Sequence, residues 1–411
     1  MDASAILPKS SVPAITGILG CVGLGLGFSL VSALKLSPGV GLAILLGSTA
    51  APMWAAELRR NSASRFRDLY LIPSRNEIRL KFENFMAAAI IWLSILCAMQ
   101  ATAAQFISGF FEVLISWFYA MPIFFVAYFF SKTDVGRESI GELFRFLSRR
   151  PGSTVPWLAI RVHVIKAFFL PLMAHAAYTW LVRADNAEAR GAEPTWFVTW
   201  FAVLYLIDTI FGTLGYMTTS KAVGANVRST ETTLLGWVSA LMCYAPFHKI
   251  VAAAGLTAYQ SKYEWHDWLT HGGLVFNVWA VAILFFSTIY AWATIVFGLR
   301  FSNLTNRGVI TSGPFRYFKH PAYLSKNISW WLISVPFIPA LGVKQAIFHC
   351  LALIFVNAIY FTRAKTEERH MMRDPVYREY SRWIDENGCF ARAAQALNPF
   401  YRVPKKPVRE S

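Results

Sequence analysis

The segment Gly308–Trp331 has the sequence GVITSGPFRYFKHPAYLSKNISWW and lies between two strongly apolar stretches of the chain. It is basic, aromatic and rich in turn-forming residues. Gly313-Pro314 is a turn signal, and the proline after His320 favours an extended conformation at that histidine, so we expect a helix to restart after it. A cationic cluster at such a position is typical of anchoring to anionic lipid headgroups. It can also form a binding site, if a second polar cluster meets it. The cluster comprises Arg316, Lys319, His320 and Lys326.

The composition of the whole chain places this segment in a membrane protein. Of its 411 residues, 55% are hydrophobic, 16% aromatic and only 15% charged, and the mean hydropathy is +0.42. Its apolar runs often approach the roughly 20 residues that cross a bilayer. Most of the Lys and Arg behind the net charge of +16 lie between these runs. They therefore indicate cytoplasmic loops and headgroup contacts, and not nucleic-acid binding.

The N-terminus and the cysteines argue against a removable signal peptide and against a disulfide framework or a metal site. Met1–Ser11 lacks the charged, apolar and small-residue pattern of a removable signal peptide. The cysteines are scattered and lie mostly inside apolar runs, so they predict core packing, with neither a disulfide framework nor a metal site. They are Cys21, Cys97, Cys243, Cys350 and Cys389.

The apolar runs predict an all-α, polytopic membrane protein with about ten transmembrane helices and a C-terminal cytosolic helical cap. The first run is rich in glycine, which permits close approach between helices. Inside an apolar span with no strand before it, such a run does not indicate a phosphate-binding loop. The expected spans are residues 12–34, 38–56, 83–105, 108–131, 156–182, 195–218, 232–255, 271–298, 322–340 and 343–362, and the glycines are Gly17, Gly20, Gly23, Gly25 and Gly27.

The links between the spans predict their orientation. Four links are basic and alternate with neutral or acidic ones, so the positive-inside rule places the basic links and both termini in the cytoplasm. Arginines mixed with apolar residues at 66–72 also indicate an interfacial amphipathic segment. The basic links are residues 59–81, 132–150, 221–228 and 300–319, and the others are 185–193 and 264–267.

Ionisable residues within the expected spans raise a functional question, because charge at membrane depth is costly. Asp208 is the hardest to place at an interface, since its side chain is short. It is expected either to be a buried structural partner, for example of His163 or His175, or to line a substrate cavity. The full set is His163, Lys166, His175, Asp208, His248 and Lys249.

A second polar cluster follows the last expected span. Arg363 and Glu367 are four residues apart, so they share a helical face and can pair. Tyr377 and Tyr380 lie on a later helical turn. A solvated helix next to the membrane with ordinary ion pairs would show the same pattern, so the cluster needs a second argument before it indicates a site.

That argument comes from topology. The last two expected spans form a hairpin with a short link, so both of its outer ends reach the same membrane face. This brings His320, Tyr323 and Lys326 close to Arg363 and Glu367. Cations suit a carboxylate, carboxylates suit an ammonium or ribose hydroxyls, and aromatic rings suit a purine or a sulfonium. These are the groups of S-adenosylmethionine, and methyl transfer from it requires mainly positioning and electrostatics.

Both clusters resemble the isoprenylcysteine carboxyl methyltransferase superfamily, which includes phospholipid methyltransferases. The resemblance covers about residues 285–383 and rests on GPFRY at 313–317, HPxY at 320–323, RxxxEE at 363–368 and YxxY at 377–380. It implies an S-adenosylmethionine-dependent enzyme that takes its donor from the cytosol and a lipidic or lipid-linked acceptor from the membrane. The predicted catalytic residues are Arg363, Glu367 and Glu368, and the predicted cofactor-binding residues are Gly313, Pro314, Arg316, Tyr317, His320, Pro321, Tyr323, Lys326, Tyr377 and Tyr380.

The chain also departs from the family pattern. Residues 1–270 add several spans, which we expect to shape an acceptor cavity or an oligomer interface, in front of a methyltransferase-like core at 271–411. Polar residues at 381–388 follow the second tyrosine, where relatives commonly have an apolar stretch containing proline. The acceptor group, a carboxylate, an amine or a thiol, is not selected by any of these residues.

Two alternatives remain. Sterol reductases of the delta-14 and delta-7 type share the His-Pro-x-Tyr motif, have about ten spans and use NADPH. The Glu367-Glu368 pair and the Gly-Pro-Phe-Arg-Tyr lead-in favour the methyltransferase. The second alternative is a lipid-binding or transport protein that retains the fold without catalysis.

Overall fold

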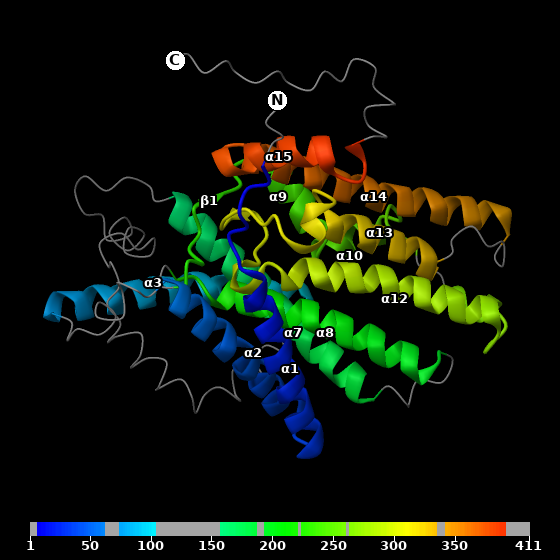
Figure 1. Ribbon diagram of the computed structural model, residues 1–411, viewed down its shortest axis with the longest axis horizontal. Coiled ribbons are helices and arrows are strands. Elements are labelled where there is room, and N and C mark those ends of the chain that lie inside the picture. Colours follow the sequence, from blue (N-terminus) through cyan, green and yellow to red (C-terminus); the bar gives the residue numbers. More distant parts are fainter. Residues whose placement is uncertain are drawn as a thin grey trace, which may run out of the picture.

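The chain is described by a computed structural model, which defines residues 6–61, 74–103, 157–186, 193–220, 223–259, 263–334 and 342–391. Within these residues the protein is all-α apart from one two-stranded pair, as predicted (Figure 1). The elements are α1 Ala14–Ala33, α2 Pro38–Asn61, α3 Arg75–Ala103, α7 Trp157–Asp185, α8 Thr195–Met217, β1 Ser229–Thr230, α9 Leu234–Leu241, α10 Phe247–Ala253, α11 Trp265–Trp268, α12 Leu274–Ile295, η4 Gly298–Arg300, β2 Thr305–Asn306, η5 Gly313–Arg316, α13 Pro321–Ser334, α14 Val343–Met371 and α15 Pro375–Asn387.

The prediction of a polytopic membrane protein is confirmed, and the number of spans is lower than predicted among the described residues. Six of their helices are long and apolar enough to cross a membrane: α1, α2, α7, α8, α12 and α14. The expected segment 83–105 falls largely within α3. The expected span 108–131 and the expected amphipathic segment 66–72 lie outside the described residues.

One predicted span is wrong. The segment 232–255 is not a continuous helix, because α9 ends at Leu241 and α10 begins at Phe247. The residue before α10 is Pro246, which has no N–H to donate to the preceding turn and therefore interrupts a helix. The two helices contain only 8 and 7 residues, too short to cross a bilayer one by one.

The expected terminal hairpin has unequal arms. Helix α13 contains 14 residues and ends at Ser334, so its described part is shorter than a span, and residues 335–341 lie outside the described chain. Helix α14 contains 29 residues and continues past the predicted end of its span at 362 to Met371. The cationic and acidic residues of the second cluster therefore lie on a direct continuation of the membrane helix.

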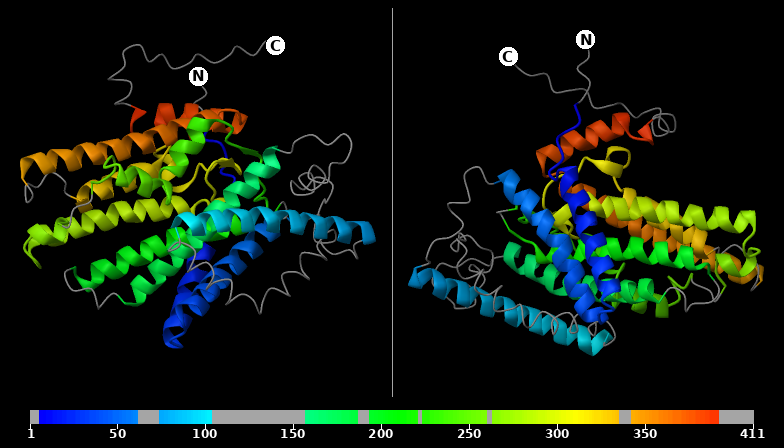
Figure 2. Two further views of the ribbon diagram at one scale, coloured as in Figure 1. Left: turned by 180° about the vertical axis from the view of Figure 1, so that it is seen from behind. Right: turned by 60° about the horizontal axis from the view of Figure 1, so that its bottom comes forward.

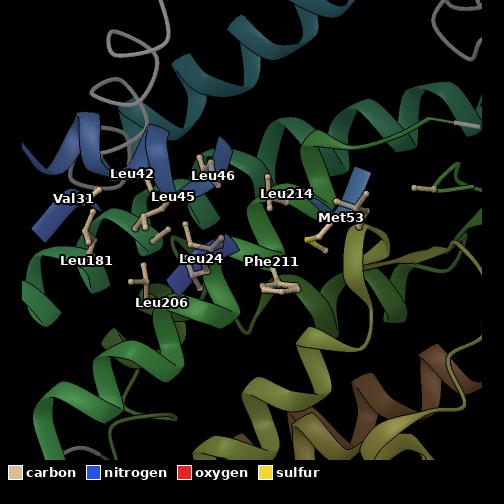
Figure 3. Packing of buried hydrophobic residues seen from close by; sticks show 14 of the residues in the cluster. Leu24, Val31, Leu42, Leu45, Leu46, Met53, Leu181, Leu206, Phe211 and Leu214 are labelled. Carbon is tan, nitrogen blue, oxygen red and sulfur yellow. The ribbon is translucent and has the colours of Figure 1, made fainter. Parts of the chain in front are cut away.

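The main core joins the N-terminal helices to α7 and α8. Figure 3 shows leucines of α1 and α2, together with Met53, meeting Leu181 of α7 and Phe211 of α8. Helices α1 and α2 pack along each other, and α8 packs against both α7 and α12. Residues far upstream of Gly308 thus provide the rigid support for the helices that carry the polar clusters.

Glycine allows the close approach of α1 and α2. A Cβ atom added at Gly23 would clash with the backbone oxygen of Ser48 on α2, whereas one added at Gly25 would meet nothing within 4 Å. The packing role predicted for the glycines of the first span is therefore confirmed at Gly23, and Gly25 faces away from the contact.

This pair gives a matched stability test. We expect Gly23→Ala to lower the free energy of unfolding by about 1–3 kcal/mol, because the new methyl group forces two backbones apart. Gly25→Ala should leave it unchanged or raise it by up to about 1 kcal/mol, since alanine favours a helix. Thermal melting of the two variants in the same detergent measures the difference. Equal melting temperatures would contradict this role of Gly23.

The polar clusters lie at one end of the α12–α13–α14 group, below α15. Figure 2 shows α15 lying across the ends of the longer helices, with the N-terminal segment beside it. Leu7 of that segment packs against a cluster containing Val309, Tyr377 and Ile384. The N-terminal segment and the C-terminal helix therefore lie on the same side of the molecule.

Candidate functional site

The outer ends of α13 and α14 meet through two polar contacts, and a third contact forms within α14. His320 Nε2 lies 3.1 Å from Glu368 Oε1, and the Tyr323 hydroxyl donates to Glu367 Oε1 at 2.5 Å. Arg363 Nε donates to the same oxygen of Glu367 at 3.2 Å. The predicted meeting of the two clusters is therefore confirmed. The Arg363–Glu367 pair forms along one helix, and the other two contacts join α14 to α13.

Arg363 is the buried centre of this arrangement. Its side chain is 4% exposed, and its Nη2 donates to the amide oxygen of Asn303 at 2.6 Å. The Tyr323 ring lies 4.9 Å from the guanidinium carbon. Asn303 in turn donates to the hydroxyl of Tyr244, which belongs to the loop after α9. One cation is thus held by a carboxylate, an amide and an aromatic face from different elements.

Helix α15 closes the site from above. Asp374 caps its first turn by accepting a hydrogen bond from the backbone N–H of Val376. Tyr380 is buried, and its hydroxyl donates to the Phe315 carbonyl at 2.7 Å. Burial raises the pKa of Tyr377 well above its usual value, and the nearby carboxylates of Glu368 and Glu367 add to this shift. Tyr377 therefore remains a neutral hydrogen-bonding group over the site at physiological pH.

Residues upstream of α12 form another wall. Strand β1 pairs with β2 in antiparallel register, with Ser229 opposite Asn306. Ser229 Oγ also lies 3.1 Å from His370 Nε2 on α14. Burial alone would raise the pKa of Glu231, but hydrogen bonds from Thr233 and Thr232 outweigh it and lower the pKa. This wall therefore holds a fixed negative charge.

These walls enclose one cavity of about 1370 Å³, including space open to solvent. Seven of the predicted site residues line it: His320, Tyr323, Lys326, Arg363, Glu367, Tyr377 and Tyr380. The other predicted residues lie outside the lining: Gly313, Pro314, Arg316, Tyr317, Pro321 and Glu368.

Some of the predicted residues outside the lining still support the cavity wall. Gly313 has a φ of +59°, and a Cβ there would lie 2.7 Å from Val296, so glycine permits η5 to pack on α12. This turn places Phe315 in the cavity wall. Glu368 acts on the wall through its contact with His320. Arg316 and Tyr317 are exposed.

Comparison with family models assigns part of the chain. Residues 274–373 match the model of the isoprenylcysteine carboxyl methyltransferase (ICMT) family. These residues are an ICMT family domain. Enzymes of this family are methyltransferases that use S-adenosylmethionine. Searches of curated proteins and of solved structures gave no match.

The ICMT domain does not contain the whole cavity. Tyr377 and Tyr380 follow it, and Glu231, Gly236, Ala240 and Tyr244 precede it in the lining. The upstream residues and Asn303 are not among those predicted from the sequence. None of them lies in a recognisable motif. The one available signal was the polar density of the segment just before Gly308.

Two buried arginines of the ICMT domain add positive charge to the cavity wall. Arg307 donates to the backbone carbonyls of Gly215 and Ala225, which ties the end of α8 to the loop after β2. Burial lowers its pKa to about 9, so it remains protonated at neutral pH. Arg300 lies 3.6 Å from Glu57 of α2. Arg307 therefore has a structural role in addition to its charge.

The prediction that Asp208 is a buried structural partner is confirmed, but its partners are not the suggested His163 or His175. Asp208 accepts hydrogen bonds from the hydroxyls of Tyr290 and Thr294 on α12, at 2.6 and 2.5 Å. Asp208 lies on the face of α8 that packs against α12. Its two partners line the cavity of the ICMT domain.

The prediction of no metal site remains a prediction. Among the described residues, Glu193, Glu264 and His266 bring three possible ligand atoms within 4.8 Å of one another. Arg183 pairs with Glu193 at 3.6 Å, and none of these residues lines the cavity. The group therefore lies outside the cavity lining.

Proposed function

We propose that this chain transfers a methyl group from S-adenosylmethionine to a lipidic or lipid-linked acceptor at the cytosolic face of a membrane. The observation that carries the proposal is the single cavity in which both motifs of the ICMT domain converge. It combines a buried cation, carboxylates and aromatic rings at the end of membrane-length helices. These groups match the donor's carboxylate, ammonium, ribose and adenine.

The donor is proposed to lie at the outer end of the cavity. Arg363 would bind its carboxylate, and Glu367 would bind its ammonium or ribose hydroxyls. Tyr377 and Tyr380 would cover it from α15, while Tyr323 offers a ring next to the cation. The donor supplies an activated methyl group on a sulfonium. The protein would align the acceptor with that methyl group and exclude water, which is the main requirement of an in-line displacement.

Two helices that line the cavity also expose apolar side chains farther along their length, and this supports access from lipid. Helix α12 exposes Val278, Val281 and Phe285, and α14 exposes Ile347 and Leu351. Side chains of this kind on membrane-length helices suit a hydrocarbon environment. The shared side of Leu7 and α15 supports placing both termini in the cytoplasm. Residues 1–270 are proposed to complete the acceptor side, since upstream residues already line the cavity.

Ligand-dependent melting tests the donor assignment. We expect S-adenosylhomocysteine to raise the melting temperature of the purified protein in detergent, because a ligand that binds only the folded state stabilises it by RT ln(1 + [L]/Kd). NADPH at the same concentration should have no effect. A shift with NADPH alone would support the reductase alternative, and a shift with neither would remove the nucleoside site.

The position of helix α15 over the cavity predicts a moderate change in ligand affinity. Tyr380→Phe removes the hydrogen bond to the Phe315 carbonyl, which holds α15 over the cavity and contributes about 1 kcal/mol. Because the bound ligand needs this cover, the Kd for S-adenosylhomocysteine should rise, by at most about fivefold. Tyr317→Phe is the comparison, because that side chain is 50% exposed and lies outside the lining. Isothermal titration of both variants measures the difference. A larger loss at Tyr317 would contradict this placement of the donor.

A further inference from the structure

A further carboxylate lines the cavity and takes no part in the donor contacts proposed above. Glu231 lies between β1 and α9, upstream of the ICMT domain, and its side chain is 4% exposed. His370 of α14 also lines the cavity, with its Nδ1 4.0 Å from Glu231 Oε2. Helix α9 packs against α14, which places the two side chains on adjoining walls (Figure 1).

The start of α9 fixes the direction of the Glu231 carboxylate. Its Oε1 accepts hydrogen bonds of 2.8 Å from the backbone N–H groups of Thr232 and Thr233 and from the Thr233 hydroxyl. Within the described part of the chain, its Oε2 accepts none. A Cβ atom at Gly236 would lie 2.5 Å from Glu231 Cγ, so glycine leaves room for this side chain. One oxygen is therefore bound by the protein, and the other is left to accept from a ligand.

The partners of His370 determine which ring nitrogen can donate to a ligand. Nε2 lies 3.1 Å from the Ser229 hydroxyl. Nδ1 is buried and has no hydrogen-bond partner among the described residues, and such a buried polar atom calls for one. A lone pair on Nδ1 would face the charge of Glu231, so the tautomer with its hydrogen on Nδ1 is favoured and Nε2 accepts from Ser229. The wall therefore presents an acceptor, Glu231 Oε2, next to a donor, His370 Nδ1.

Other polar groups of the lining leave this pattern unchanged. Arg307 has five N–H hydrogens, and backbone carbonyls accept all of them. Thr305 has a buried hydroxyl without a partner among the described residues, and a hydroxyl can either donate or accept. Three further cations of the lining contact other groups: Arg300 pairs with Glu57, Lys319 with Asp385, and Lys326 lies over the Tyr290 ring.

The position of the pair on α14 suits the end of the donor that is farthest from its amino acid. Arg363, Glu367 and His370 follow one another on one face of this helix. The seven residues from Arg363 to His370 span about 10 Å. A donor whose carboxylate is bound by Arg363 therefore brings its base toward His370. Met371 and Tyr377 also line this part of the cavity and belong to one apolar cluster, which offers a surface to a flat ring.

We propose that Glu231 and His370 recognise the adenine of S-adenosylmethionine. Adenine carries a 6-amino group, which donates, beside a ring nitrogen, which accepts. Glu231 Oε2 accepts from the amino group, and His370 Nδ1 donates to the ring nitrogen. A 6-oxo base turns a carbonyl oxygen toward the carboxylate and is rejected.

This inference rests on the proposed methyltransferase function and specifies how its donor is selected. It also gives the segment upstream of the ICMT domain a part in the donor site, in addition to its part on the acceptor side. Glu231 is therefore a specificity-determining residue that the ICMT domain does not contain.

Two ligands that differ in the base test this recognition. S-inosylhomocysteine carries a 6-oxo group where S-adenosylhomocysteine carries the 6-amino group. Isothermal titration of the full-length protein in detergent measures the Kd of each. We expect the Kd of S-inosylhomocysteine to be at least about a hundredfold higher, because its carbonyl faces a carboxylate that needs a donor. Equal affinity for the two ligands would overturn the inference.

Glu231→Gln should shift the preference toward the 6-oxo base. Three donors hold Oε1, so the amide oxygen stays there and the new NH₂ group takes the place of Oε2. That group donates to a 6-oxo oxygen and faces a 6-amino group unfavourably. We expect the ratio of the two Kd values to fall by at least about tenfold. Glu264→Gln is the control, because this carboxylate lies outside the cavity lining, and it should leave the ratio unchanged.

The pattern of loss separates recognition from a structural role. Equal weakening of both ligands in Glu231→Gln, or an unchanged ratio, would overturn the inference. The wild-type comparison remains decisive if this variant does not fold. If the wild-type protein binds S-adenosylhomocysteine and S-inosylhomocysteine equally well, the donor assignment stands and the base recognition is wrong. If it binds neither, the proposed function fails and this inference fails with it.

Discussion

Glu367→Gln is expected to reduce methyl transfer by about a hundredfold or more while the protein still folds. Glu367 accepts hydrogen bonds from the Tyr323 hydroxyl and from Arg363, at the point where the hairpin ends meet. Glutamine keeps the shape but removes the negative charge, so the donor's ammonium or ribose loses its partner. Loss of one preorganised charged group in an active site typically costs about 10²–10³ in turnover. The labelled methyl assay measures the rate.

The stability cost of this change should be smaller than the loss of rate. Glu367 is 30% exposed, so its pairing with Arg363 is partly screened by solvent. We expect the free energy of unfolding to fall by about 1–2 kcal/mol. Glu379→Gln is the control, because Glu379 is an exposed carboxylate on α15. Unfolding of Glu367→Gln would instead assign the Arg363–Glu367 pair a purely structural role.

Arg363→Met should abolish donor binding and also destabilise the protein. The guanidinium is buried and serves Glu367, Asn303 and the Tyr323 ring at once. Methionine fills much of the volume but leaves the carboxylate and the amide without their partner. Removing one member of a buried pair costs about 3–5 kcal/mol. Melting without ligand, and then with S-adenosylhomocysteine, separates the two effects.

Two further variants sharpen this prediction. Arg363→Lys keeps the charge but cannot reach a carboxylate and an amide with one planar group, so it should recover part of the stability and little of the binding. Arg382→Met removes an exposed arginine from α15 and should change neither quantity. Normal ligand binding by Arg363→Met would contradict a donor carboxylate bound to this guanidinium.

The meeting of His320, Tyr323, Arg363 and Glu367 was predictable because it depends on residues that are close together in the sequence. Arg363 and Glu367 are four residues apart on one helix, and a short hairpin brings His320 and Tyr323 to that helix whatever the rest of the chain does. The residue types at these positions then indicate a charged and aromatic ligand. The predicted C-terminal helical cap is present as α15, in which Asp374 caps the first turn and Pro375 is the first residue.

The surroundings of Asp208 were not predictable from the sequence, because they depend on packing between distant segments. Asp208 lies more than eighty residues before its partners Tyr290 and Thr294, and no spacing rule connects α8 to that face of α12. The same holds for Asn303 and for the β1–β2 pair. The wrong span at 232–255 has a local cause, because Pro246 lies inside that apolar run and interrupts the helix.

The most direct test of the central claim is methyl transfer in the native membrane. Membranes containing the protein are incubated with S-adenosylmethionine tritiated in its methyl group, and the label is followed into lipid and protein fractions. We predict label in a lipidic or lipid-linked product that is absent from membranes without the protein and lost in Glu367→Gln. Equal labelling with the wild-type protein, with Glu367→Gln and without the protein would contradict the account.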